Sequence, residues 1–192
     1  MGDGLAYLTA EEGKSYLEKL REEIYSVFPE ENFFVTLESL NSMPYLDAVV
    51  KELLRLCNPV PIHGRRLSTN WKIPTKTDFL EINLENDCQM DALVIIGGMC
   101  RDEKYWGKDA AEFNPDRWER DDLNMRAFAP FSNGPRNCIG KHLALCTMKT
   151  EFIYLIKNFE MKCSENRLNS KDLEAELMIK FKDEPTIEFT VK

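Results

Sequence analysis

FSNGPRNCIG, residues 131–140, stands directly before a long segment of helical periodicity and decides how the rest of the sequence is interpreted. Cys138 precedes the expected helix start, where unpaired N–H groups and the positive end of the helix dipole favour a thiolate. Arg136 adds positive charge nearby, and Gly134 and Gly140 let the backbone approach a flat, bulky group. Cys138 is therefore the one cysteine suited to be an anion; the alternative is a small buried cysteine in a glycine-containing loop.

Length and composition set the broad class of the chain. It has 192 residues, 43% of them hydrophobic and 30% charged, which is ordinary for one soluble globular domain. The net charge of −8 argues against a nucleic-acid partner, which requires a basic surface. No run approaches the roughly 20 apolar residues of a membrane span, and residues 1–4 do not resemble a signal peptide.

The cysteines are scattered along the chain and form no CxxC pair, which disfavours both a disulfide framework and a structural zinc site. They are Cys57, Cys88, Cys100, Cys138, Cys146 and Cys163. Cys138 and His142 have the four-residue spacing of metal ligands on a helix, but a zinc site at this pair is the weaker interpretation.

Hydrophobic periodicity predicts three amphipathic helices. The first covers residues 10–28, begins at a capping box formed by Thr9 and Glu12, and ends at Pro29. The second runs from Pro44 to residue 57, and the third begins near residue 140 and presents an apolar face up to residue 159.

The β-structure is expected to be minor. Residues 60–100 favour short strands and turns, with a buried strand at 92–96, and residues 101–130 are expected to be irregular. Segments 176–181 and 186–191 alternate apolar and polar residues, which predicts a C-terminal hairpin. The fold class is therefore mainly α with small β-sheets.

The segment around Cys138 resembles the haem-binding loop of the cytochrome P450 family, the haem-thiolate monooxygenases, in its eukaryotic form. Phe131, Gly134, Arg136, Cys138 and Gly140 match every fixed position of the family pattern FxxGxRxCxG. The resemblance implies that Cys138 is the axial ligand of the haem iron and that Phe131 packs beside it. It also implies that Arg136 pairs with a haem propionate.

Further motifs agree with this resemblance in kind and order. Glu52-Leu-Leu-Arg55 matches the family's ExxR, residues 113–118 (FNPDRW) resemble its PERW segment, and residues 101–107 resemble its RDxxxWG stretch. By resemblance, Arg117 closes a buried structural triad with Glu52 and Arg55. Arg65 and Arg66 both stand where the family places an arginine that binds the second propionate, and the sequence does not choose between them.

The resemblance implies the chemistry of a monooxygenase with haem b as cofactor. One oxygen atom of O₂ enters a small apolar organic substrate, with electrons from NADPH delivered by a flavoprotein reductase or another electron donor. It also suggests the endoplasmic reticulum membrane as the location of a full-length form. Two alternatives stay open: a haem-binding remnant or sensor without activity, and a structural domain that has lost its cofactor.

The resemblance covers residues 1–192 as the C-terminal part of such an enzyme, from helix J onward. The family's helix I and most of its substrate-recognition loops would lie upstream. We therefore assign no catalytic residue here and expect this polypeptide alone to be inactive. Residues 78–91, which are acidic and without clear period, are expected to be an insertion of about a dozen residues.

Overall fold

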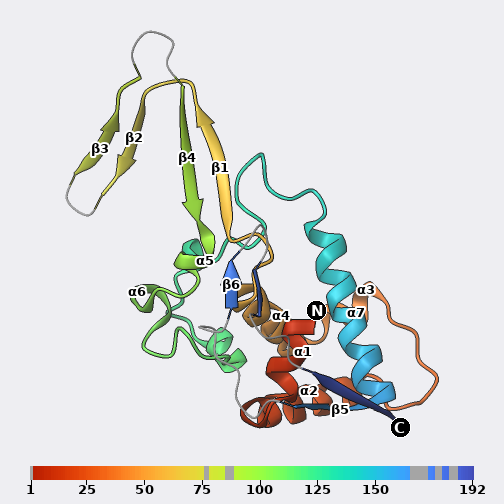
Figure 1. The fold of residues 1–192 in the computed structure, drawn as a ribbon. Coiled ribbons are helices and arrows are strands. Elements are labelled where there is room, and N and C mark those ends of the chain that lie inside the picture. The colour runs from red at the N-terminus through yellow and green to blue at the C-terminus, as the bar shows by residue number, and fades with distance from the viewer. Residues whose placement is uncertain (1, 76–77, 85–88, 165–172, 176–178, 182–185) are drawn as a thin grey trace.

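The computed structural model describes residues 2–75, 78–84, 89–164, 173–175, 179–181 and 186–192, in which a helical body carries a projecting β-arm (Figure 1). The helices are α1 (Gly2–Thr9), α2 (Lys14–Val27), α3 (Leu37–Asn41), α4 (Pro44–Leu56), α5 (Ile96–Met99), α6 (Glu103–Trp106) and α7 (Lys141–Asn158). Three 3-10 turns lie between them: η1 (Glu11–Gly13), η2 (Pro115–Glu119) and η3 (Met125–Ala127).

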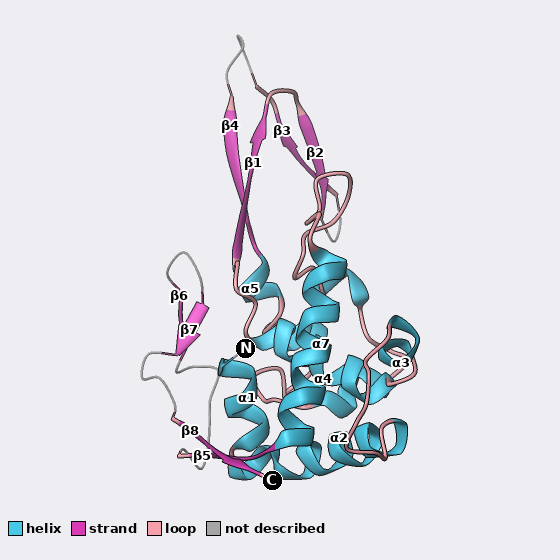
Figure 2. Cartoon of the chain, turned by 90° about the vertical axis from the view of Figure 1, so that its right-hand side faces the viewer, coloured by secondary structure: helices cyan, strands magenta, loops and turns pink. Residues whose placement is uncertain are grey.

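The strands form two-stranded antiparallel sheets. The pairs are β1 (Ile62–Leu67) with β4 (Met90–Ile95), β2 (Trp71–Pro74) with β3 (Phe79–Ile82), β5 (Phe159–Cys163) with β8 (Ile187–Val191), and β6 (Leu173–Ala175) with β7 (Ile179–Phe181). The pairs β1–β4 and β2–β3 make the arm, which stands clear of the helices in both views (Figures 1 and 2). The predicted class, mainly α with small sheets, is confirmed.

The main core lies among α1, α2, α4 and α7. Side chains with no exposed surface include Leu20 of α2, Leu46 and Val49 of α4, and Ile153 and Ile156 of α7. Each such burial contributes about 1.5–3 kcal/mol relative to exposure in water. The core therefore fixes α4 against α7, the helix that begins immediately after Cys138. Within the described residues no helix is long and apolar enough to cross a bilayer.

The predicted helices are present, but the start of the first one was placed wrongly. Thr9 is the last residue of α1, where its hydroxyl donates to the carbonyl oxygen of Leu5 at 2.7 Å. The helix that follows begins at Lys14, after the turn η1. The threonine side chain bonds to the preceding helical turn instead of capping the next helix, so the predicted capping box is wrong.

Two predictions about strands are also wrong. The strand at 92–96 is β4; it ends at Ile95, and its Leu93 is 69% exposed because β1 and β4 pack on no helix along most of their length. The segments of the expected C-terminal hairpin do not pair with each other: β7 pairs with β6, and β8 pairs with β5. The turn proposed between them, and residues 176–178, lie outside the described residues.

The acidic segment 78–91 contains regular structure that its lack of periodicity did not predict. Phe79–Ile82 forms β3, which folds back on β2, and the first residues of β4 follow at Met90. Both faces of β3 are largely exposed, so the strand needs no alternation of apolar and polar residues. Residues 85–88 lie outside the described part, and the interpretation of 78–91 as an insertion stays a prediction.

A half-buried carboxylate ties α4 to α7 below the loop of Cys138. Asp47 of α4 accepts from Lys149 of α7 at 2.7 Å and from Lys51 at 2.6 Å. Burial opposes the charged form of Asp47, but the hydrogen bonds from Lys149 and Lys51 outweigh it and lower the pKa of this carboxyl below 3.8. Since Lys149 is buried, removing its carboxylate partner would leave an unpaired charge in the body.

This ion pair predicts a pH-dependent contribution to stability. A carboxyl with a lowered folded-state pKa stabilises the fold above about pH 3.8 and loses that contribution as the pH falls through the folded pKa. Asp47→Asn should therefore lower the free energy of unfolding at neutral pH by about 1–2 kcal/mol, discounted because Asp47 is partly exposed. Urea unfolding of both proteins, from neutral pH to below about pH 3.8, measures this difference in the free energy of unfolding. A deficit that persists undiminished in acid would contradict the assignment, and Asp122→Asn, in an exposed pair with Arg120, is the control.

Candidate haem-thiolate site

The loop that carries Cys138 closes on its own backbone before α7 begins. The N–H of Cys138 donates to the carbonyl of Phe131 at 2.9 Å, and the N–H of Asn137 donates to that of Gly134 at 3.1 Å. Gly134 has φ +81°, a left-handed conformation that disfavours any residue with a Cβ. The N–H of Lys141, the first residue of α7, donates to the carbonyl of Cys138 at 3.3 Å. The sulfur thus stands at the positive end of an 18-residue helix.

Exposure separates Cys138 from the other cysteines that the structure describes. Cys100 and Cys163 are buried, Cys57 and Cys146 are half-buried, and only Cys138 is exposed. Burial raises the pKa of the Cys100 thiol to about 11, so that cysteine stays protonated. Cys88 lies outside the described residues. Among the described cysteines, Cys138 alone is accessible to a large ligand.

A cavity of about 410 Å³ opens beside Cys138, between β1, the loop and α7. Its wall is mostly apolar, and its charged side chains, Arg65 and Arg136, are both cationic. The full lining is Leu54, Asn58, Pro59, Val60, His63, Arg65, Pro130, Phe131, Ser132, Arg136, Cys138, Ala144 and Met148. No carboxylate belongs to this lining, although the whole chain carries a net charge of −8.

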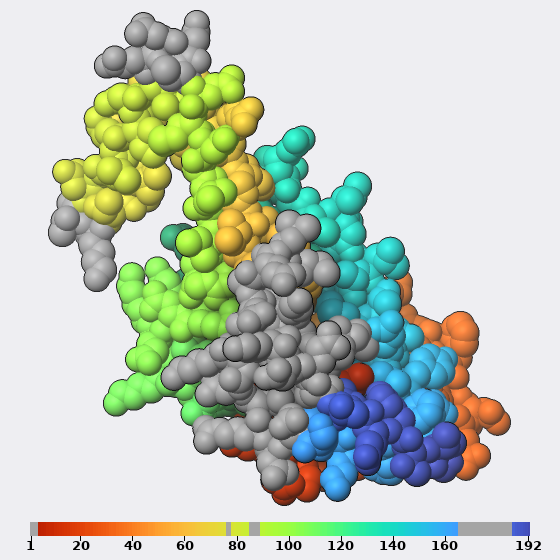
Figure 3. Space-filling view, in the orientation of Figure 1, coloured from red at the N-terminus to blue at the C-terminus, as the bar shows by residue number. Residues whose placement is uncertain are grey.

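The two arginines that the sequence left open lie on opposite sides of β1. Arg65 lines the cavity, and its guanidinium donates to the Ser132 hydroxyl of the loop at 3.3 Å. Arg66 points away and pairs with Asp91 of β4 at 2.9 Å. Adjacent residues of a strand face opposite sides, so only one of the two can face the loop. Figure 3 shows β1, in orange-yellow, directly beside the teal segment that leads into α7.

These features suit an iron porphyrin, which has a flat apolar ring, a metal that binds thiolate and two carboxylates at one edge. The cavity supplies apolar walls, an exposed thiol and two arginines. A Cβ built on Gly134 would meet no atom within 4 Å, so the space next to the loop is open. A Cβ on Gly140 would lie 3.9 Å from the Cys138 sulfur, in ordinary contact. The residues present therefore fit haem.

Phe131 links this loop to the helical body. Its half-buried ring packs against the main core and lines the cavity of Cys138. The same ring borders a smaller cavity of about 250 Å³ on its other side, between α4, α7 and the loop. The phenylalanine thus separates two cavities and holds the loop against the core, as expected for a residue beside Cys138.

The structure brings the three residues of the expected triad together with no exposed side-chain surface. Glu52 accepts from Arg55 at 2.8 and 2.9 Å and from Arg117 at 2.9 Å. It also accepts from the indole N–H of Trp118 at 3.0 Å and from the backbone N–H of Asn114 at 2.9 Å. One buried carboxylate therefore joins α4 to the segment 114–118.

Both arginines of the triad have further partners. Arg55 donates to the carbonyls of Cys100, Ala110 and Glu112 at 2.5–2.9 Å, and its guanidinium lies over the ring of Trp106. Arg117 donates to the carbonyl of Trp106 at 3.0 Å. These bonds attach segment 100–117, which contains α6 and the start of η2, to α4, because several of its backbone carbonyls accept from the arginine side chains.

Asp109 belongs to this network and was missed by the sequence argument. It accepts from Arg117 at 3.0 and 3.3 Å and from Asn114 at 3.1 Å. Burial disfavours its charge, but these hydrogen bonds and the Arg117 charge prevail and lower its pKa. One glutamate beside two arginines leaves an excess positive charge, so a second acid could have been expected. Asp109 supplies it and makes the network neutral.

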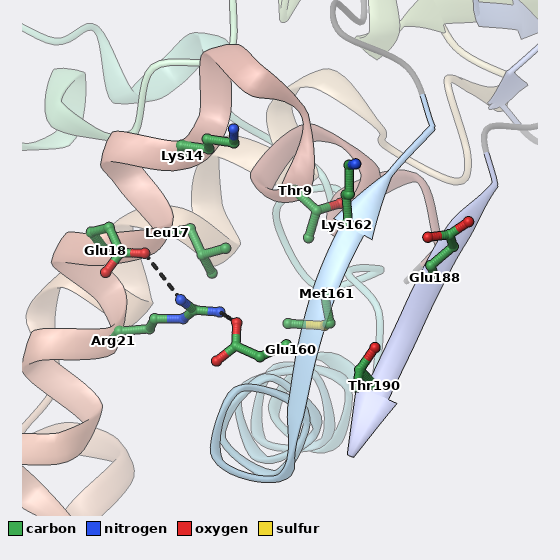
Figure 4. Close-up of a pocket in the computed structure, with 10 residues that line it drawn as sticks. All are labelled: Thr9, Lys14, Leu17, Glu18, Arg21, Glu160, Met161, Lys162, Glu188 and Thr190. Carbon is green, nitrogen blue, oxygen red and sulfur yellow. Dashed lines mark hydrogen bonds and ion pairs between the residues drawn. The ribbon is translucent and has the colours of Figure 1, made fainter. Parts of the chain in front are cut away.

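Another cavity, of about 470 Å³, lies between α2 and the β5–β8 pair and is lined mainly by polar and charged residues (Figure 4). Three of its charged side chains are paired with each other: Arg21 donates to Glu18 at 3.0 Å and to Glu160 at 2.6 Å. It contains neither cysteine nor histidine. Within the described part of the chain, no three acidic, cysteine or histidine side chains are placed to hold a metal ion.

The sequence was compared with known proteins. A sequence model of the family described as "Cytochrome P450" matches residues 12–187. Alkane hydroxylase MAH1 of Arabidopsis thaliana is 34% identical over 77% of this chain and 28% of that protein. Cytochrome P450 52-M1 of Starmerella bombicola is 35% identical over 73% of this chain and 27% of that protein. Cytochrome P450 4V2 of Rattus norvegicus is 32% identical over 78% and 27%.

These relatives are all eukaryotic, and the chain spans less than a third of the length of each. The family match itself covers most of the chain, from α2 to β8, and includes the loop of Cys138 and the network around Glu52. Its members are haem-iron monooxygenases. The chain belongs to the cytochrome P450 family.

Proposed function

We propose that this chain forms the thiolate side of the haem site in a cytochrome P450 monooxygenase. The observation that carries the proposal is the exposed Cys138, which shares one apolar cavity with two arginines and no carboxylate. In this proposal the sulfur of Cys138 would bind the haem iron. Arg65 and Arg136 bind the propionates as charge-assisted donors.

Haem held by a thiolate supplies the chemistry that inserts one oxygen atom of O₂ into an organic substrate. The residues of this chain hold and orient that group. The start of α7 and Arg136, which lines the same cavity as Cys138, place positive charge on the side of the chain where an iron-bound thiolate would lie. Phe131 and Gly134 shape the loop on which the ring would lie. The network around Glu52 attaches segment 100–117 to α4.

The activity of a whole protein that contains this chain is part of the same proposal. The apolar cavity wall supports a small apolar organic substrate, and the name of the Arabidopsis relative, an alkane hydroxylase, agrees with that class. Electrons would come from NADPH through a flavoprotein reductase. A full-length form would reside at the endoplasmic reticulum membrane.

Haem titration tests the first requirement of the proposal, that this chain binds haem. We expect saturable binding of one haem per chain, followed by the Soret absorbance, because a single cavity offers thiol and cations together. Gradual binding without saturation, as haem shows on nonspecific apolar surfaces, would contradict it.

The contrast between Arg65 and Arg66 gives a sharper prediction. Arg65→Gln should weaken haem binding at least about tenfold, since it removes a charged donor from the cavity. Arg66→Gln removes the same charge from the opposite face of the same strand and should leave haem affinity unchanged. Equal effects of the two substitutions, measured by haem titration, would mean that only the overall charge of β1 matters.

A further inference from the structure

Two polar side chains in the cavity of Cys138 each have a buried atom with unused hydrogen-bonding capacity. Asn58, which follows α4, has no exposed surface, and His63 lies on β1. Among the described residues, neither Nδ2 of Asn58 nor Nε2 of His63 has a hydrogen-bond partner, although both atoms are buried. Buried polar atoms are paired in the great majority of cases, so two unpaired ones in one cavity point to a ligand.

The side-chain oxygen of Asn58 fixes the orientation of the amide group. Its Oδ1 accepts from the backbone N–H of Val60 at 3.2 Å, so the amide nitrogen is the atom that remains unpaired. An amide nitrogen only donates. His63 lies two residues before Arg65 on β1, and side chains two apart on a strand face the same side. His63 and Arg65 therefore face the cavity together.

The charges around the cavity identify the ligand's chemistry. Arg65 and Arg136 are donors only, and so is the unpaired nitrogen of Asn58. The lining contains no acidic side chain that could receive these bonds. We propose that Asn58 and His63, beside Arg65, form a subsite for a carboxylate in this otherwise apolar cavity.

Two ligands could supply that carboxylate at this place. One is a propionate of the haem; the other is an apolar organic acid bound as substrate. The inference rests on the proposed function, because both ligands belong to a haem monooxygenase. It goes beyond that function by assigning two residues that neither the thiolate loop nor the ion-pair network uses.

Matched variants isolate the subsite. His63→Leu removes the imidazole, and His63→Gln restores a side-chain N–H. Asn58→Asp keeps the oxygen that accepts from Val60 and replaces only the donor nitrogen with an anionic oxygen. His142→Leu, on the exposed face of α7, is the control for loss of a histidine elsewhere. Circular dichroism establishes that each variant is folded before binding is measured.

The first arm compares hemin with its dimethyl ester, which lacks both carboxylates. If a propionate is the ligand, His63→Leu and Asn58→Asp weaken hemin binding at least about tenfold and leave ester binding unchanged. His63→Gln recovers part of the loss. The second arm compares decanoate with decanol by calorimetry, on the chain with and without hemin. If an organic acid is the ligand, the same variants weaken only decanoate binding.

A selective loss in either arm supports the subsite and names its source. Unchanged discrimination between carboxylate and ester, and between acid and alcohol, in both variants overturns it. Failure of the unmodified chain to bind hemin saturably would instead overturn the proposed function, while the decanoate arm on the hemin-free chain would still report on Asn58 and His63.

Discussion

Glu52→Gln should lower the free energy of unfolding by about 3–5 kcal/mol, the largest stability effect expected for a single substitution in this chain. The substitution keeps the size of the side chain but removes the only charge that Arg55 and Arg117 share. Both guanidinium groups would then remain buried beside a neutral amide. The amide can also accept through only one of its two terminal atoms, so the five bonds that Glu52 accepts cannot all persist.

Urea unfolding followed by circular dichroism measures this effect. The matched control is Glu81→Gln, which breaks the exposed pair between Glu81 and Lys72 on the arm and should cost less than about 1 kcal/mol. Similar losses for the two substitutions would show that the buried network carries no special share of the stability. Glu52→Gln should also bind haem less well, since segment 100–117 is attached to α4 through Arg55 and Arg117.

Cys138→Ala should abolish the red-shifted band of the reduced carbon monoxide complex completely. The expected loss is total because the band reports thiolate ligation, and Cys138 is the exposed cysteine of the cavity. The fold should survive, since the side chain is exposed and lies outside the core. Its backbone bond to Phe131 is retained in the variant.

Cys146→Ala is the matched control for this substitution. Cys146 lies within α7, which begins just after Cys138; it is half-buried and does not line the cavity. The variant should keep the red-shifted band at full intensity. A band that persists in Cys138→Ala, or disappears in Cys146→Ala, would assign the ligand to a different cysteine.

The sequence predicted those parts of the fold that have a period or a motif. The apolar faces of α4 and α7 repeat every three to four residues, and both helices were predicted correctly. The loop pattern singled out Cys138 as the proposed iron ligand. The capping box predicted at Thr9 and Glu12 was wrong because a threonine followed three residues later by glutamate also occurs at the end of a helix. The strands of the arm are largely exposed and have little core on which to pack, so periodicity carries little information about their pairing.

The sequence motifs predicted the site residues individually. The structure adds which of them face the same cavity and which of their polar atoms are hydrogen-bonded. Spacing could not choose between Arg65 and Arg66, because the choice depends on which side of β1 faces the loop. The unpaired atoms of Asn58 and His63 have no sequence signal at all, since hydrogen-bond satisfaction is a property of the folded cavity. Asp109 could have been anticipated only by balancing the charges of the buried triad.

The spectrum of the unmodified chain tests the central claim most directly. The protein is loaded with one equivalent of haem, reduced, and measured with and without carbon monoxide. Ligation by the Cys138 thiolate predicts the red-shifted difference band characteristic of an anionic sulfur ligand. A folded, haem-loaded chain whose carbon monoxide complex shows only the unshifted band of a neutral ligand would contradict the assignment of Cys138.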